Sequence, residues 1–242
     1  MKKVLLSIGI AIVLMAQAGI ASSALVFSDN FNAGSLNTFW WTPSAGTGNT
    51  VTHANNRIEM TQGSGAVGSD LNFNFLINGD FTADVEYSFL NWPVDNGERL
   101  GIRIDAGAVQ GAVERVSDHD FGYESYLIDI GGNITHTPTG DTSGSLRLKR
   151  EGTVFTGYYW SGSDWTTIHT YDSGSASDTN LALSIWPAVN PRHVTSGVKV
   201  VFDNFRLNAP DMANPIPEPA TLLLLSTGLI GFAGFRRKKL KM

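Results

Sequence analysis

Residues 81–89 read Phe-Thr-Ala-Asp-Val-Glu-Tyr-Ser-Phe, with apolar side chains at the odd positions and polar side chains at the even ones. Side chains of a β-strand point alternately to the two faces of a sheet, so this period of two predicts a strand with one buried and one solvated face. The same alternation recurs at 100–105, at 146–149 and at 198–205, where it breaks at Asp203-Asn204. One buried face per strand is typical of antiparallel sheets.

Turn-forming residues separate these strands. Clusters of Gly, Asn, Asp and Ser lie at 78–80, 95–97, 131–133 and 161–164, and each predicts a β-hairpin. No long helical period with caps lies between them. About ten short strands at this spacing predict an all-β fold, a β-sandwich or jelly roll, over residues 25–208.

The composition excludes several classes of protein. The chain has no cysteine, which excludes disulfides, a cysteine nucleophile and cysteine-ligated zinc. The net charge of the 242 residues is -5, but the stretch 25–208 holds ten basic and twenty acidic residues, a net charge of -10. Such a surface repels polyanions, so we expect neither nucleic acid nor an anionic membrane face as a partner.

The N-terminus has the parts of a secretory signal peptide. Lys2 and Lys3 precede an apolar run from Val4 to Met15, and small residues follow it. We expect residues 1–24 to form a signal helix that directs export through the Sec machinery, with cleavage after Ala24 and, as the competing choice, after Ala18. The alternative is an uncleaved N-terminal anchor.

The C-terminus predicts a second membrane-directed segment. Residues 209–216 are proline-rich and are expected to form a linker, because proline removes backbone donors and resists helix. The apolar stretch 220–235 would rise about 24 Å as a helix, and long basic side chains can extend it across a bilayer core of about 30 Å. We therefore expect a transmembrane helix, followed by a stop-transfer basic cluster on the cytoplasmic side: Arg236, Arg237, Lys238, Lys239 and Lys241.

The order of these elements resembles the PEP-CTERM sorting signal. Pro217, Glu218, Pro219 and Ala220 are followed by a leucine-rich span with spaced glycines and then by the basic cluster. The resemblance implies a Gram-negative bacterium with an extracellular polysaccharide matrix, and a substrate of the membrane protease-transpeptidase exosortase. The protein would then pass the inner membrane transiently and reach the cell surface or the extracellular matrix. The alternative is an ordinary C-terminal membrane tail.

Three stretches of the body resemble concanavalin A-like, laminin-G-type sandwich domains: 28–36, 146–165 and 201–206. In many of these relatives the two chain ends pair, and some of them bind a structural calcium ion there. The resemblance therefore implies calcium ligands at Asp29, Asn30 and Asp203, because calcium prefers carboxylate and carbonyl oxygens. We favour the simpler interpretation, in which Asp29 and Asn30 only make turn hydrogen bonds, and we expect no other cofactor. This fold hosts glycan binding, glycan hydrolysis and adhesion alike.

The carboxylates do not show the spacing of a glycosidase. The retaining glucanases of this fold carry Glu-x-Asp-x-x-Glu on one strand, and no such motif occurs. Asp84 and Glu86 share a face but are most simply solvated, and Glu124 and Asp129, five residues apart, are expected on opposite faces of a strand. We therefore predict no catalytic residue and no enzyme. The alternative is a hydrolase whose two carboxylates meet only in the folded chain.

The tryptophans offer the best candidate ligand contacts, because sugar rings stack on flat aromatic faces. Trp92, Trp160 and Trp186 are expected at strand ends, and the polar residues Asp95 and Asn96 follow Trp92. We expect an exported, non-catalytic surface or matrix protein that binds polysaccharide through these five residues. The alternatives are the hydrolase and a purely structural or adhesive unit.

Overall fold

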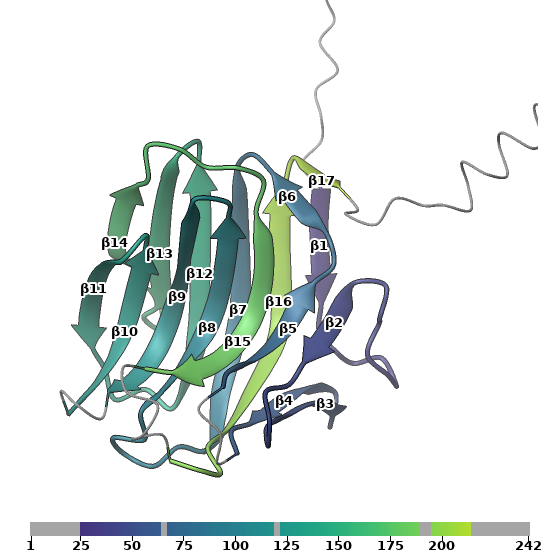
Figure 1. The fold of residues 1–242 in the computed structure, drawn as a ribbon, viewed down its shortest axis with the longest axis vertical. Helices are drawn as coiled ribbons and strands as arrows, with labels where there is room; N and C mark the ends of the chain where they lie inside the picture. The colour runs from purple at the N-terminus through teal and green to yellow at the C-terminus, as the bar shows by residue number, and fades with distance from the viewer. Residues whose placement is uncertain (1–24, 64–66, 119–121, 189–194, 214–242) are drawn as a thin grey trace, which may run out of the picture.

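The computed structural model describes residues 25–63, 67–118, 122–188 and 195–213 (Figure 1). These ranges contain strands, turns and loops and no helix, so none of them offers a helix long and apolar enough to span a membrane. The predicted signal peptide, the sorting motif with its apolar segment, and the basic tail lie outside the described residues.

The described residues form three antiparallel sheets. The order of the eight-stranded sheet is β14 (Trp165–Asp172), β13 (Val154–Trp160), β12 (Ser143–Glu151), β7 (Phe81–Asn91), β16 (Lys199–Ala209), β4 (Arg57–Thr61) and β3 (Thr50–Ala54), with β1 (Leu25–Asp29) also on β16. The order of the seven-stranded sheet is β11 (Asn133–Pro138), β10 (Tyr123–Ile130), β9 (Val109–Asp118), β8 (Glu98–Ala106), β15 (Asn180–Pro187), β5 (Ser69–Phe73) and β2 (Trp41–Ser44). β17 (Asp211–Ala213) and β6 (Leu76–Asn78) pair as a short third sheet.

The two large sheets lie face to face, with the hydrophobic core between them (Figure 1). The odd residues from Phe81 to Tyr87 are buried, and so are the even residues from Leu100 to Ile104 of the facing sheet. The residues between them point to the outer faces, as the period of two requires. The predicted all-β sandwich is therefore confirmed.

Two of the four predicted hairpins form and two do not. Gly131-Gly132 joins β10 to β11, and the turn at 161–164 joins β13 to β14. The turn at 95–97, with positive φ at Asp95 and Gly97, instead carries the chain from β7 in one sheet to β8 in the other. The turn at 78–80 likewise leads from the short sheet into β7. The hairpin prediction is wrong at these two places, because turn residues specify a chain reversal and not the partner of the next strand.

The first strand of the sandwich pairs with a strand from its C-terminal part. β1 runs antiparallel to β16, with Leu25 opposite Ala209 and Asp29 opposite Phe205. The break predicted at Asp203-Asn204 is present as a register shift in β16, and Asn204 has a φ of 49°. The strands also extend past residue 208. β16 ends at Ala209, and β17 (Asp211–Ala213) lies within the stretch 209–216 predicted as a linker. The start of β1 and the strand β17 lie at the same end of the sandwich (Figure 1).

Candidate functional site

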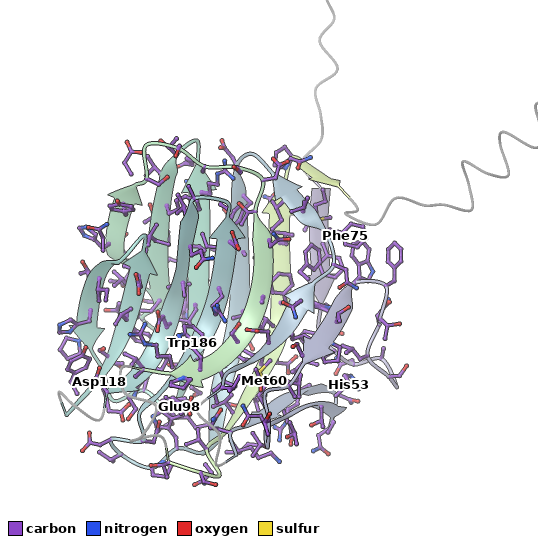
Figure 2. All side chains as sticks on the ribbon, in the orientation of Figure 1. His53, Met60, Phe75, Glu98, Asp118 and Trp186 are labelled. Carbon is purple, nitrogen blue, oxygen red and sulfur yellow. The ribbon has the colours of Figure 1, made fainter. Side chains whose placement is uncertain are left out.

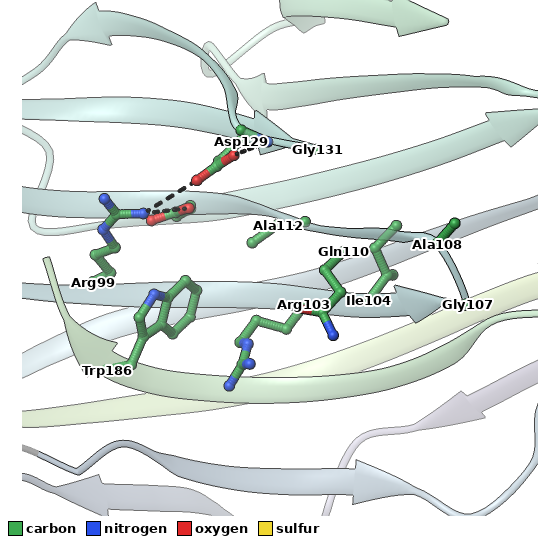
Figure 3. Close-up of a pocket in the computed structure, with 13 residues that line it drawn as sticks. Arg99, Arg103, Ile104, Gly107, Ala108, Gln110, Ala112, Asp129, Gly131 and Trp186 are labelled. Carbon is green, nitrogen blue, oxygen red and sulfur yellow. Dashed lines mark hydrogen bonds and ion pairs between the residues drawn. The ribbon is translucent and has the colours of Figure 1, made fainter. Parts of the chain in front are cut away.

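A hollow of about 510 Å³ opens on the outer face of the seven-stranded sheet. It runs along β8 and β9 from Trp186, near one end of the sheet (Figure 2), to the turns at 107–108 and 131–132. Ala112 forms part of its floor, between Arg103 on β8 and Asp129 on β10 by strand register. A methyl group at this outward position leaves space that the longer neighbours enclose (Figure 3).

Three charged side chains form one cluster in this hollow. Arg99 Nη1 lies 3.4 Å from Glu114 Oε1 and 3.7 Å from Asp129 Oδ2 (Figure 3). The two distances add to 7.1 Å, which is the widest separation these two carboxylate oxygens can have. The folded chain therefore brings two acids from adjacent strands around one guanidinium.

The cluster is buried and its hydrogen bonding is incomplete. Glu114 is 0% exposed. Glu114 Oε2, Arg99 Nε and Ser125 Oγ have no hydrogen-bond partner in the described part of the chain. Arg99 and Ser125 both pair with Val116 in the strand register, so the three atoms belong to one neighbourhood. Unpaired buried polar atoms cost about 1–3 kcal/mol each, so the fold holds this cluster at a cost in stability.

Burial also changes the protonation of Glu114. It raises the pKa of this carboxyl to about 7, against the opposing effect of the Arg99 guanidinium. The negative charge of Asp129 acts in the same direction as burial. Burial therefore favours the protonated form of Glu114, in which the carboxyl can donate a hydrogen bond as well as accept one.

Trp186 forms one wall of the hollow. Its ring lies 5.4 Å from the Arg103 guanidinium carbon, a cation–π contact. Arg103 is itself paired with Asp70, at 3.1 Å. Trp186 lies opposite Arg99 in the strand register, so its indole stands next to the charged cluster. The site therefore combines an aromatic surface with donors and acceptors, the chemistry of a small polar ligand site.

The five predicted ligand residues do not form one site. Trp186 lines the hollow. Trp92 stacks on Phe89 at 4.2 Å and donates to Glu124, while Asp95 and Asn96 lie in the same β7–β8 loop. Asn96 is buried, and its amide bonds to Pro93 O and to the Glu98 backbone N–H of that loop. Trp160 lies on the opposite sheet.

The three predicted calcium ligands make turn and ring hydrogen bonds. Asp29 accepts from the Phe31 N–H at 2.8 Å and from the Trp41 indole at 2.9 Å, so both its carboxylate oxygens are used. The Asn30 side-chain oxygen accepts a hydrogen bond from the Asn32 backbone N–H. The Asp203 carboxylate accepts one from the Asn204 backbone N–H. Among the described residues, no three His, Asp or Glu side chains are grouped to hold a metal ion. The calcium site therefore stays a prediction, and the turn hydrogen bonds expected in its place are present at Asp29 and Asn30.

The structure also places the acids considered for catalysis. Glu124 and Asp129 lie on opposite faces of β10, as predicted, since Glu124 pairs with Arg115 and Asp129 with Arg99. Asp84 is not simply solvated but forms a bidentate pair with Arg147, at 2.6 and 2.8 Å. Sequence reasoning missed Glu114 because no spacing links it to Asp129. Its one local signal is a lone carboxylate within the largely apolar run 109–116.

Residues 215–238 match the PEP-CTERM protein-sorting motif. No curated protein matches the chain by sequence. The solved structures it resembles share its fold at very low identity. One belongs to work on endo-acting O-glycanases of the human gut microbiota that initiate mucin breakdown (TM-score 0.60, 9% identity, 76% of this chain and 99% of that one).

Two further structures have the same architecture. One is the Crh5 transglycosylase in complex with NAG (TM-score 0.60, 11% identity, 78% of this chain and 86% of that one). The other is the carbohydrate recognition domain of Emp47p (TM-score 0.55, 8% identity, 79% and 99%). This chain therefore joins a concanavalin A-like β-sandwich to a PEP-CTERM protein-sorting motif, which implies an exported protein.

Proposed function

We propose that the protein is a non-catalytic cell-surface or matrix protein, processed by exosortase at its C-terminal motif, that binds neutral polysaccharide in the hollow beside Trp186. The observation that carries the binding proposal is the Trp186 indole wall beside the Arg99 guanidinium and the partly exposed Asp129 carboxylate, which line the same hollow. Sugars present apolar ring faces and many hydroxyl groups, which such a site complements. The acidic body favours an uncharged polymer over a polyanion.

Removing the indole should weaken this binding. We expect Trp186→Ala to lower affinity for the polymer at least 10-fold, about 1.4 kcal/mol, because the apolar ring contact is lost. Trp186→Phe should lose less affinity. Phe39→Ala should lose none, because Phe39 is a 58% exposed ring that does not line the hollow. The measurement is affinity electrophoresis of the full chain with laminarin, xylan, glucomannan and dextran, with polygalacturonate as the anionic comparison. If the mobility of the protein in all five polymer gels equals its mobility in a gel without polymer, the proposal is refuted and a purely structural or adhesive role is favoured.

The Glu114–Asp129 pair supports glycan cleavage as a second candidate. Retaining glycosidases hold two carboxyl groups about 5–5.5 Å apart and inverting ones about 6.5–9.5 Å apart. A separation of at most 7.1 Å, from 3.4 and 3.7 Å to one guanidinium, is compatible with either. The pKa of Glu114, raised to about 7, suits a general acid, and because the side chain is 0% exposed, cleavage would also require a movement that uncovers it.

A reducing-end assay separates the two candidates. If cleavage occurs, the polymer that binds best should release new reducing ends near pH 7, and Glu114→Gln should abolish the release. Glu151→Gln, a change at an exposed carboxylate, is the matched control. Binding without new reducing ends identifies a binding protein.

The sorting motif can be tested in cells that contain exosortase. Replacing Pro217, Glu218 and Pro219 by alanine should leave the chain unprocessed and in the membrane fraction, because the recognised peptide is gone. Arg236→Lys with Arg237→Lys keeps the charge and should be processed normally. Immunoblots of membrane and extracellular fractions provide the measurement. Identical processing of the alanine variant would exclude exosortase recognition at this motif.

A further inference from the structure

A second hollow, of about 350 Å³, lies on the outer face of the eight-stranded sheet. Its lining includes Arg57, Glu86, Ser145 and Asp203. We propose that this face is a second binding site for neutral polysaccharide, so that one sandwich holds two polymer chains. The proposal rests on the proposed function and adds a site, on the opposite sheet, to the one beside Trp186.

The most exposed tryptophan belongs to this face. Trp160 is 38% exposed, whereas the other five tryptophans are buried or half-buried. Its ring meets Trp165 edge to face, with centroids 5.5 Å apart. The Arg147 guanidinium covers Trp165 at 3.9 Å and is fixed by the bidentate pair with Asp84. A supported indole loses little conformational entropy when a ligand stacks on it, which favours binding.

Strand register connects the indole with the hollow. Asp203 pairs with Glu86, and Glu86 pairs with Ser145. The pairing of Leu146 with Tyr159 brings Ser145 next to Trp160 on the neighbouring strand. Adjacent strands lie about 4.8 Å apart, so Trp160 stands about 10 Å from Glu86 across one continuous row. An extended glycan crossing the strands would meet the indole and the carboxylates together.

The polar groups of the row suit sugar hydroxyls. Glu86 is exposed, and Asn204 Nδ2 holds its Oε2 at 2.8 Å, which orients the carboxylate. Carboxylates accept hydrogen bonds from hydroxyl pairs, and the Arg57 guanidinium can donate to others. Two acids against one arginine disfavour an anionic polymer. Serine side chains between Glu86 and Trp160 leave the row open.

The two sites face away from each other. The sheets of a sandwich stack about 10 Å apart, and each hollow lies on an outer face, so one straight polymer segment cannot occupy both. A protein with this arrangement links two polymer chains. Cross-linking is therefore the property that distinguishes two sites from one.

The experiment uses the full chain, purified in mild detergent, and the neutral polymer that binds best among laminarin, xylan, glucomannan and dextran. Calorimetric titration with its short oligosaccharides should give two sites for the wild type, one for Trp160→Ala, one for Trp186→Ala and none for the double variant. Mixtures with the long polymer should become turbid with the wild type and stay clear with Trp160→Ala, with Trp186→Ala and with the double variant. Trp160→Phe keeps an aromatic face and should retain two sites, and Phe39→Ala is the control for an unrelated exposed ring.

Each outcome decides the proposal. If Trp160→Ala keeps two sites and full turbidity, or if Trp186→Ala abolishes all binding, the second site does not exist while the first one stands. If Trp186→Ala keeps two sites and Trp160→Ala leaves one, the first site is misplaced. Absence of binding by the wild type overturns both sites. Melting temperatures of the variants, measured on the same preparations, identify any loss that comes from unfolding.

Discussion

Replacing Glu98 by glutamine should stabilise the protein by roughly 4 kcal/mol at pH 8 and by little at pH 4. Glu98 begins β8 on the core side of the sheet, is 0% exposed, and has no hydrogen-bond partner for either carboxylate oxygen in the described residues (Figure 2). Burial raises the pKa of this carboxyl from 4.5 to about 8. Between these two values the unfolded chain has released the proton and the folded chain keeps it.

The sign of the pH dependence follows from this proton. The folded state binds more protons, so stability is full below pH 4.5 and falls as the pH rises to about 8, by about 1.4 kcal/mol per pH unit. Above pH 8 both states are ionised and the loss stops. Glu114 adds a similar loss only up to about pH 7, because burial raises its pKa to that value. Both carboxyls act in the same direction, and the effect of Glu98 extends to the higher pH.

Urea unfolding, followed by tryptophan fluorescence from pH 4 to 9, tests this prediction. Glu98→Gln should remove most of the fall in unfolding free energy between pH 7 and 8. Glu151→Gln alters an exposed carboxylate and should leave the wild-type profile unchanged. Parallel profiles of Glu98→Gln and the wild type would show that Glu98 ionises normally in the folded protein.

Replacing Arg115 by methionine should destabilise the protein by about 3–5 kcal/mol. The Arg115 side chain is 2% exposed, and its Nη1 lies 2.6 Å from Glu124 Oε2. It also donates to the carbonyls of Val116 and Asp141, and its guanidinium lies 5.5 Å from the Phe89 ring. Methionine fills much of the volume but leaves the Glu124 carboxylate without the Arg115 counter-charge, while the Trp92 indole still donates to it.

A double-mutant cycle measures the cost of the unpaired charge. Arg115→Met with Glu124→Leu removes both charges, and it should recover most of the loss because a buried ion pair can be replaced by apolar residues at little cost. The measured quantity is the unfolding free energy at pH 7. A loss below about 1 kcal/mol for Arg115→Met alone would mean that the pair contributes no more than an exposed one.

Local pattern predicted the strands whose outer faces are wet. The alternation at 81–89 and 100–105 reappears as buried odd or even residues in β7 and β8. β9 lacks this pattern, since Ala112–Asp118 are buried on both faces. Side chains of the charged cluster and its neighbours cover the outer face of β9 over these residues. The sequence of β9 therefore does not alternate between apolar and polar residues. Glu114 lies in this doubly buried stretch, so no sequence motif marked it as part of the hollow.

The amino-acid sequence by itself determined the two-faced strands, the positions of the chain reversals and the C-terminal sorting motif, because each depends on neighbours along the chain. The tertiary structure alone decided that the reversal at 95–97 crosses between sheets, that Glu114 and Asp129 share Arg99, and that Trp160 and Trp186 stand on opposite faces. These relations join residues from strands whose pairing follows from packing the whole core, and no local spacing encodes that pairing.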